Sequence, residues 1–421
     1  MKPTVYKRWQ SKQVIHALKT RRVVVVSGAR QSGKTTLAQA IAPTDTAYYT
    51  LDDLLLLEAA KSDPHGFVMH EQKLMIIDEI QRAPELLRAI KKEVDSNQNY
   101  GRFLLTGSAN IQALPNAIES LAGRSRTIRL RPLTRGEMLS TPPRFLENAF
   151  DEHFARHKYR TKNNQAPEEY NKNHYLSLAF RGGYPEADRL NEATDIRQWH
   201  DDYIAALLGN DLKDVANIRR KDSMVKLLEC LAAWSSKYID ISGIGASLSI
   251  RRPTIESYIN ALETLYLVER VSPWTKTDYA RVGKKDKLFL TDTGLMASIL
   301  KWNINKVRLD GEKNGKLIET YVFTQLAAII DVQDSHYALY HYRDRLNREI
   351  DFLVENENGD YLGIEVKAGS VVKTDSFKHL RWFKENMAAD NHFIGVVLYT
   401  GENIARFGEG MWAVPINALW A

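Results

Sequence analysis

A glycine-rich loop close to the N-terminus limits the folds open to this chain. Residues Gly28–Thr35 read GARQSGKT and fit the pattern G-x-x-x-x-G-K-[ST] without a mismatch. The loop follows the apolar run Val23–Ser27, which predicts a buried strand. It precedes Lys34–Ala42, which predicts a helix that Pro43 ends. A strand–loop–helix unit of this kind is typical of proteins that bind nucleotide phosphates.

The residue types of this loop suit a phosphate group. Glycines let the backbone approach an anion closely, and the start of the following helix adds a positive dipole end. Lys34 would bridge the β- and γ-phosphates of ATP, and the hydroxyl of Thr35 would hold Mg²⁺. A surface loop that matches by chance is the alternative. The predicted nucleotide-binding residues are the loop and the next threonine: Gly28, Ala29, Arg30, Gln31, Ser32, Gly33, Lys34, Thr35 and Thr36.

A second motif lies further along the chain. Leu74–Glu79 reads LMIIDE, an apolar strand that ends in two carboxylates. Asp78 would hold Mg²⁺ through water, and Glu79 would orient or polarise the water that attacks ATP. Apolar strands that end in an acidic turn are common, so the motif gains its weight from its position downstream of a phosphate loop.

Two more polar residues are candidates for the same site. Ser108 follows the apolar run Arg102–Thr106, where a hydroxyl would touch the γ-phosphate or the attacking water. Arg124, in the sequence LAGR, would stabilise charge in the transition state, either in cis or from a neighbouring subunit. The alternative for Arg124 is a surface arginine within a basic segment.

The middle of the chain has the pattern of a winged helix-turn-helix. Helical stretches lead to Pro253–Leu265, the predicted recognition helix, and two strands flank the basic stretch Lys276–Lys287, the predicted wing. The alternative is a module for packing or for protein contact. Phosphate contact is predicted from basic side chains at the helix start and in the wing: Arg251, Arg252, Lys276, Arg281, Lys284, Lys285 and Lys287.

Charged and apolar residues alternate in two predicted strands near the C-terminus. Glu349–Val354 reads EIDFLV, which places Glu349 and Asp351 on one face of a strand. Glu365 and Lys367 share a face of the next strand. The separation is that of a hairpin, so the two acidic faces are expected to be neighbours.

These residues form the D…ExK pattern of PD-(D/E)xK nucleases. Asp351 and Glu365 would hold Mg²⁺, and Lys367 would position or activate water for attack on a phosphodiester. Glu319, on the preceding predicted helix, and Glu349 would lie near the same site. The alternative is an amphipathic hairpin whose charged face is solvated or paired.

Composition narrows the class and the expected location. The 421 residues are 44% apolar and 26% charged, which excludes a mainly disordered or fibrous chain. The lone cysteine, Cys230, excludes an intrachain disulfide and a cysteine-based zinc site. The apolar runs are far shorter than the roughly 20 residues that span a bilayer, and the first residues lack the apolar core of a signal peptide. We therefore expect a cytoplasmic protein without a membrane partner, whose net charge of +6 permits contact with nucleic acid.

The motifs also resemble those of a known family. After the phosphate loop come IDEIQR, LTGSAN, LAGR, GGYPEA, TDTGL, EIDFLV and EVKAG, in that order. Together they resemble a bacterial and archaeal family of AAA+ ATPases in which an AAA core is fused to a C-terminal domain of unknown function. The polar stretch 151–174 departs from the pattern. The resemblance implies ATP binding and hydrolysis, a winged-helix-like middle and a PD-(D/E)xK-like end.

The predicted fold class is α/β, because strands alternate with helices up to about residue 130 and so favour a covered parallel sheet. We expect a P-loop AAA+ core at 1–134 and a helical lid or linker at 135–220. A winged-helix-like segment at 221–300 and a nuclease-like domain at 301–421 would follow.

The predicted function is that of a Mg²⁺-dependent ATPase whose nucleotide state repositions the other domains. Nucleic acid, with DNA favoured over RNA, a protein partner and further copies of the chain are the expected partners. Two alternatives stay open. One is an ATP-gated, metal-dependent nuclease, and the other is a non-catalytic ATP-binding regulator or scaffold.

Overall fold

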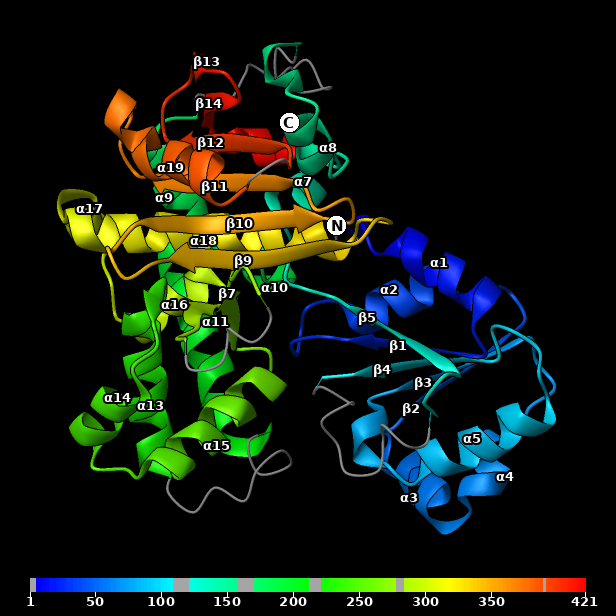
Figure 1. The fold of residues 1–421 in the computed structure, drawn as a ribbon. Helices are drawn as coiled ribbons and strands as arrows, with labels where there is room; N and C mark the ends of the chain where they lie inside the picture. The colour runs from blue at the N-terminus through cyan, green and yellow to red at the C-terminus, as the bar shows by residue number, and fades with distance from the viewer. Residues whose placement is uncertain (1–4, 109–120, 157–169, 212–220, 278–283, 389–390) are drawn as a thin grey trace.

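Two β-sheets organise the structure, a computed structural model that describes residues 5–108, 121–156, 170–211, 221–277, 284–388 and 391–421. In Figure 1 the smaller sheet and its helices form the N-terminal unit, coloured blue to cyan. The larger sheet lies on the other side of the molecule and contains the C-terminal strands, coloured yellow to red.

The smaller sheet has five strands in the order β2-β3-β4-β1-β5, and neighbouring strands pair parallel. Every residue of β1, β3 and β4 is buried, as expected where helices cover both faces of a parallel sheet. The predicted α/β core is confirmed. The strands are β1 (Val23–Ser27), β2 (Thr46–Thr50), β3 (Leu74–Asp78), β4 (Phe103–Gly107) and β5 (Ser125–Arg129).

Helices cover both faces of this sheet, as Figure 1 shows. Val24 lies in one apolar core with Leu37 of α2, whereas Val25 lies in another with Ile90 of α5. Burying one such side chain contributes about 1.5–3 kcal/mol, so the alternation along the strands holds both layers in place. The helices are α1 (Ser11–Thr20), α2 (Lys34–Ile41), α3 (Leu54–Ser62), α4 (Pro64–Val68) and α5 (Leu86–Ser96).

The middle of the chain has the element order that the sequence predicts. A helix, a short strand and two helices are followed by two strands, and β8 pairs antiparallel with both β6 and β7. The two-residue strand β6 was not predicted. The elements are α13 (Lys221–Trp234), β6 (Lys237–Tyr238), α14 (Ile241–Leu248), α15 (Arg252–Thr264), β7 (Val268–Pro273) and β8 (Lys287–Leu290).

The larger sheet joins this middle segment to the C-terminal strands. Its order is β13-β14-β12-β11-β10-β9-β7-β8-β6, and β7 pairs parallel with β9. The strand β12 (Phe393–Tyr399) is followed by β13 (Ala405–Gly408) and β14 (Met411–Pro415), which extend the sheet. The other C-terminal strands are β9 (Tyr337–Arg343), β10 (Glu349–Asn356) and β11 (Tyr361–Lys367).

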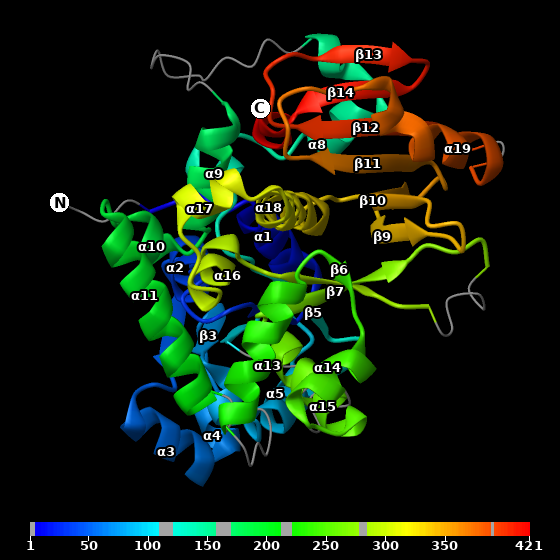
Figure 2. The same ribbon diagram turned by 90° about the vertical axis from the view of Figure 1, so that its left-hand side faces the viewer.

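Two helices pack on opposite faces of the C-terminal strands. Phe352 of β10 lies in one core with Leu317 of the long helix α18 (Gly311–Asp331). Leu353, the next residue, lies in another core with Phe383 of α19 (Lys378–Asn386). Ile350 lies in the same core as Leu353 and not with Phe352, so the alternation that the sequence predicts is broken where the pairing of β10 with β9 shifts register. In Figure 2 the helix α18 is seen along its axis beside the sheet.

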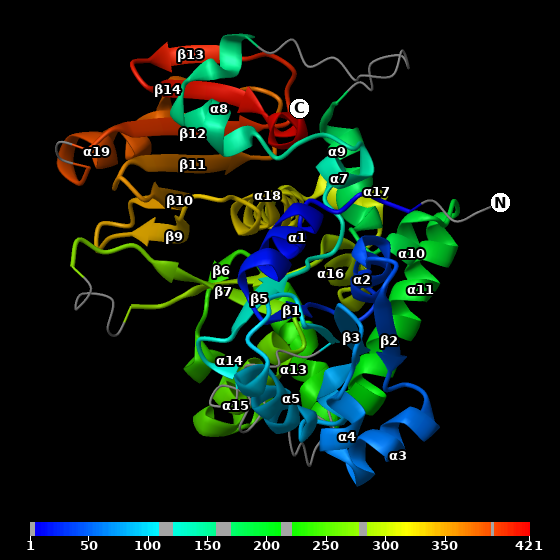
Figure 3. The ribbon, with the colours of Figure 1, turned by 90° about the vertical axis from the view of Figure 1, so that its right-hand side faces the viewer.

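The helical segment after the first sheet contacts both halves of the molecule. Tyr175 of α9 accepts a hydrogen bond from the backbone of Asn417 at 3.1 Å and is buried against the C-terminal part. The helix α11 lies beside the N-terminal unit in both side views (Figures 2 and 3). The helices of this segment and those after β8 are α7 (Arg135–Met138), α8 (Phe145–Phe150), α9 (Lys172–Arg181), α10 (Pro185–Asp188), α11 (Ala193–Ala206), α16 (Thr293–Ile299) and α17 (Ile304–Leu309).

Across the residues that the structure describes, we find no helix with both the length and the apolar character needed to cross a membrane.

Candidate active site

The glycine-rich loop connects the end of β1 to the start of α2. Gly28 is required by close packing, because a Cβ atom there would lie 2.1 Å from the carbonyl oxygen of Leu130. Gly33 has a φ of +96°, in the left-handed region that favours glycine. Both pattern glycines are therefore needed to shape the loop itself. Thr36 is exposed in the first turn of α2.

Lys34 and Ser32 mark the place where an anion would bind. The Lys34 side chain is 4% exposed, and its ammonium donates a hydrogen bond to the carbonyl oxygen of Ala29 at 2.9 Å. Ser32 is fully buried, and within the described chain its hydroxyl has no hydrogen-bond partner. A buried polar group without a partner costs about 1–3 kcal/mol, which a phosphate oxygen would offset. The loop therefore fits a phosphate group.

Asp78 ends β3 and joins the loop to the neighbouring strands. Its carboxylate accepts hydrogen bonds from the hydroxyls of Thr35 at 2.9 Å and Tyr48 at 3.0 Å, and from Thr106 of β4. Burial, followed by the charge of Asp78, raises the pKa of Tyr48 to about 12, so this phenol stays protonated. The structure thus brings the predicted pair Thr35 and Asp78 together. Tyr48 and Thr106 are contacts that the sequence analysis missed.

Glu79 is held beside this group by three polar contacts. Its φ of +59° is unusual for a residue other than glycine. Its carboxylate accepts hydrogen bonds from the hydroxyl of Ser108 at 3.0 Å and from the amide of Gln81, and its backbone N–H donates to Thr106 at 3.3 Å. Ser108 was predicted to contact phosphate or water, and here it orients Glu79. Gln81 lies in the quoted IDEIQR motif, which was the available signal for it.

The residues of this site fit a magnesium ion bound with ATP. The Thr35 hydroxyl and the Asp78 carboxylate are oxygen ligands of the kind that Mg²⁺ takes, and they are already in contact. When bound, Mg²⁺ neutralises charge on the phosphates.

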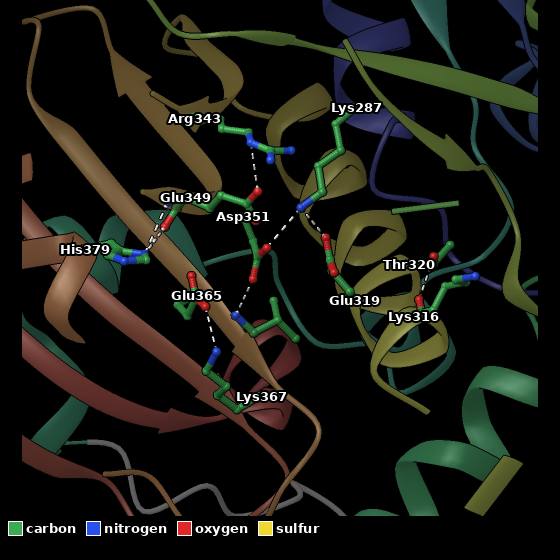
Figure 4. Close-up of polar contacts among 11 residues, drawn as sticks. Lys287, Lys316, Glu319, Thr320, Arg343, Glu349, Asp351, Glu365, Lys367 and His379 are labelled. Carbon is green, nitrogen blue, oxygen red and sulfur yellow. Dashed lines mark hydrogen bonds and ion pairs between the residues drawn. The ribbon is translucent and has the colours of Figure 1, made fainter. Parts of the chain in front are cut away.

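A second polar cluster lies on β10, β11 and α18 (Figure 4). Asp351 accepts a hydrogen bond from the backbone N–H of Val366 at 2.9 Å, and the ammonium of Lys367 contacts Glu365 at 2.7 Å. The pairing of β10 with β11 brings Asp351 beside Glu365, as the hairpin spacing predicts. Glu349 is turned to Arg343, at 3.2 Å, and is outside this group.

Lys287 lies at the centre of this cluster, and its predicted role in the wing is wrong. The side chain is 4% exposed, and its ammonium lies 2.9 Å from Asp351 and 2.5 Å from Glu319. Burial alone would lower the pKa of Lys287, but the two carboxylates outweigh it and raise that pKa. Burial, and then the charge of Asp351, raises the pKa of Glu365 to about 8 and that of Glu319 to about 7.

The cluster does not fit the divalent ion that the D…ExK pattern implies. The ammonium of Lys287 already lies between Glu319 and Asp351, where an ion shared by these carboxylates would lie. Among the described side chains, no three His, Cys, Asp or Glu residues are arranged to hold a metal ion. The predicted residues therefore converge, but around an ammonium group.

His341, next to this cluster, gives a test of the fold through pH. The side chain is 2% exposed, and one ring nitrogen lies 3.1 Å from the carbonyl oxygen of Lys285. Burial, and then the charge of Lys287, lowers the pKa of His341 to about 3. In the unfolded chain the His341 side chain takes up a proton below about pH 6.5, whereas in the folded chain it stays neutral. The contribution of His341 to the stability of the fold is therefore full above that pH and is lost as the pH falls toward 3.

Between pH 7 and pH 5 the wild type should lose about 2 kcal/mol of stability through His341, and the variant His341→Gln should not show this loss. Thermal unfolding of the full chain at both pH values measures this, with the exposed His336→Gln as control. A variant with the pH slope of the wild type would contradict the buried, neutral state of His341.

Comparisons with known proteins agree with this architecture. A family profile described as "AAA domain" matches residues 20–139, which contain the phosphate loop, Asp78, Glu79 and the five-stranded sheet. A profile described as a domain of unknown function, DUF4143, matches residues 314–419. A further domain of unknown function, DUF8612, matches residues 172–306.

Residues 20–139 of this chain thus match an AAA domain.

Similar proteins were found among curated proteins and solved structures. An uncharacterized protein of Mycobacterium tuberculosis is 28% identical over 405 residues, which cover 94% of this chain and 80% of that protein. A protein of Mycobacterium bovis matches to the same extent. Among solved structures, the Holliday junction branch migration motor RuvB of Thermotoga maritima is 17% identical, with a TM-score of 0.30, over 63% of this chain and 90% of that chain. A STAND protein of Pyrococcus horikoshii is 15% identical, with a TM-score of 0.25, over 78% of this chain and 46% of that chain.

Arg124 lies at the far edge of the AAA sheet from the loop. It precedes β5, whose first residue, Ser125, pairs with Val23 at the start of β1, whereas the loop follows the end of β1. Its guanidinium pairs with Asp95 at 2.5 Å. The predicted role in cis is therefore wrong, because a whole strand length separates Arg124 from the phosphate site. The role from a neighbouring subunit stays a prediction.

Arg8 joins the AAA loop to the rest of the molecule, and no sequence pattern indicated it. The side chain is 6% exposed and pairs with Glu137 at 2.9 Å. Its guanidinium donates to the carbonyl oxygens of Ser32 and Arg131, both at 2.6 Å. A displacement of the loop would therefore also change the contact between Arg8 and Arg131.

Arg131 continues this connection into the larger sheet. It donates two parallel hydrogen bonds to Glu269 of β7, at 2.7 and 3.0 Å, and one to Asp331 at the end of α18, at 2.6 Å. Burial would raise the pKa of Glu269, but Arg129 and Arg131 lower it to about 2, so this carboxylate is ionised at neutral pH. The AAA domain is thus tied to two elements of the C-terminal half by charged, mostly buried contacts.

Proposed function

We propose that this AAA+ protein binds ATP with Mg²⁺ and hydrolyses it, and that its nucleotide state controls the attached modules. The observation that carries the proposal is the joined set of Thr35, Asp78 and Glu79 around a loop that fits phosphate. ATP hydrolysis needs a charge clamp and a group that orients water, and Lys34 and Glu79 would supply them in one site.

Each residue has a separate task in the proposed reaction. Lys34 would exchange its contact with the Ala29 carbonyl for the β- and γ-phosphates. Thr35 and Asp78 would hold Mg²⁺. Glu79 would accept a hydrogen bond from the attacking water and orient it toward the γ-phosphate, with Ser108 fixing the carboxylate.

Two contacts support control of the other modules by the nucleotide. Arg8 links the Ser32 carbonyl to Arg131, and Tyr203 of α11 donates a hydrogen bond to the carbonyl oxygen of Arg30 at 3.0 Å. Ser32 and Arg30 belong to the loop that would bind the phosphates. Binding or release of the nucleotide would therefore change the contacts that hold α11 and β7.

Nucleic acid, with DNA favoured, and a second copy of the chain are proposed partners. Arg251 and Arg252 lie exposed at the start of α15, where phosphate contact is predicted, although Arg252 also pairs with Glu256 at 2.8 Å. Arg281 lies outside the described residues. A second copy would be needed for Arg124 to reach a phosphate site.

A metal-dependent nuclease is the second candidate function. It is favoured by the convergence of Asp351, Glu365 and Lys367 on neighbouring strands, with Glu319 beside them. Lys287 opposes it, because its ammonium lies in the middle of this group.

ATP turnover by the purified full chain tests the proposal. We expect Mg²⁺-dependent turnover in the wild type and none above background in Lys34→Ala, with the exposed Lys61→Ala as matched control. Unchanged turnover in Lys34→Ala would refute the site. Binding of ATP without any turnover would favour the regulator or scaffold, and no binding of purine nucleotide at saturating Mg²⁺ would refute both.

A further inference from the structure

We propose that Lys287 closes the acidic cluster of the C-terminal half. In the wild-type fold its ammonium takes the place of a divalent cation between Glu319 and Asp351, so the cluster takes up no divalent metal. The metal site that the PD-(D/E)xK pattern implies would therefore be blocked in the wild type, and Lys287 would be the residue that blocks it.

Geometry is the first argument. The Lys287 nitrogen lies 2.5 Å from a Glu319 oxygen and 2.9 Å from an Asp351 oxygen. Mg²⁺ binds oxygen at about 2.0–2.1 Å and strongly prefers octahedral geometry. An ion bound to these same two oxygens would overlap the ammonium or lie against it, and like charges repel strongly where water is excluded.

The remaining oxygens of the cluster are also engaged. The second oxygen of Asp351 accepts the backbone N–H of Val366 at 2.9 Å, and Glu365 is paired with Lys367 at 2.7 Å. Figure 4 shows the two lysines entering from different elements, with the carboxylates between them. Three carboxylates are thus balanced by two ammonium groups, which reduces the local demand for another cation.

The position of Lys287 is fixed, because this buried residue is part of a β-strand. It pairs in β8 with Val271 of β7 and Tyr238 of β6. The rings of Phe289 and Phe352 each lie 5.9 Å from its ammonium. Withdrawing it would require the middle module to move away from α18 and β10.

Binding of Mn²⁺ to the full chain without nucleotide, measured by electron paramagnetic resonance, tests the proposal. Lys287→Met keeps a long unbranched side chain and removes the charge. We expect this variant to bind one more Mn²⁺ ion than the wild type, with the affinity of the cluster for Mn²⁺ raised at least tenfold. Asp351→Asn in the same background should remove that ion. Lys284→Met, exposed on the same segment, is the matched control and should behave as the wild type.

Two results would overturn the proposal. One is Mn²⁺ binding by the wild type that Asp351→Asn abolishes, and the other is a folded Lys287→Met variant that gains no ion. If Lys287→Met does not fold, backbone cleavage by Fe²⁺ and ascorbate in the wild type decides the matter. We expect no cleavage within β10 and β11, and cleavage there would show that metal enters past Lys287.

Discussion

Replacing Glu79 with Gln is expected to lower kcat for ATP hydrolysis by about 100-fold or more, because a group that orients and polarises the attacking water contributes roughly 10²–10⁴-fold. ATP affinity should change little, since Glu79 is assigned to the attacking water and not to the phosphates. The amide of Gln has nearly the shape of the carboxylate, and the hydroxyl of Ser108 can still donate a hydrogen bond to its oxygen. Steady-state turnover together with equilibrium binding of labelled ATP separates the two effects.

Glu85→Gln is the matched control, since Glu85 is exposed at the start of α5 and lies outside these contacts. It should hydrolyse ATP as the wild type does. If Glu79→Gln retained full turnover, Glu79 would not orient the water. A loss of ATP binding together with turnover would instead indicate that the substitution had disturbed the loop.

The second large effect is expected at Arg131. Arg131→Met should destabilise the chain by about 3–5 kcal/mol, because removing one partner of a buried ionic group leaves the other charges uncompensated. The side chain is 8% exposed and holds Glu269 and Asp331 at once. Thermal unfolding should show the loss. Arg126→Met, on the strand β5 that precedes Arg131, is the control and should change stability much less.

A multiple variant separates lost packing from uncompensated charge. Adding Glu269→Gln and Asp331→Asn to Arg131→Met should restore part of the lost stability, since the orphaned charges are gone. Hydrogen exchange measures the coupling. A non-hydrolysable ATP analogue should alter exchange in β7 and β8 of the wild type, and Arg131→Met should reduce that response. An additive triple variant, with no recovery, would argue against the ionic network.

The sequence predicted the AAA domain well because its information is local. The strand, loop and helix around Gly28, Gly33 and Lys34 form one contiguous unit whose conformation follows from nearby residues. Asp78 and Glu79 follow directly from a buried strand. Alternation along EIDFLV likewise predicted that Ile350 and Phe352 are buried, although a register shift in β10 puts them in different cores.

Other features depend on which segments meet in space. Arg124 was placed in the site by its motif, yet the parallel register of β5 with β1 puts it at the opposite edge of the sheet. The strands β13 and β14 are short, and four and five residues carry little periodic signal. Arg8 belongs to no motif, since it contacts the side chain of Glu137 and the backbone carbonyl oxygens of Ser32 and Arg131, all distant in the sequence.

The amino-acid sequence by itself determined the phosphate loop, the acidic strand end and the hairpin of β10 and β11, because each depends on residues that are close together in the chain. The tertiary structure alone decided that Lys287 is buried in the acidic cluster and is not part of an exposed wing, and that Arg131 connects the two halves of the molecule. The physical reason is that a charged side chain is buried at low cost only where folding brings opposite charges from distant segments beside it. Local sequence patterns do not indicate which distant segments come into contact.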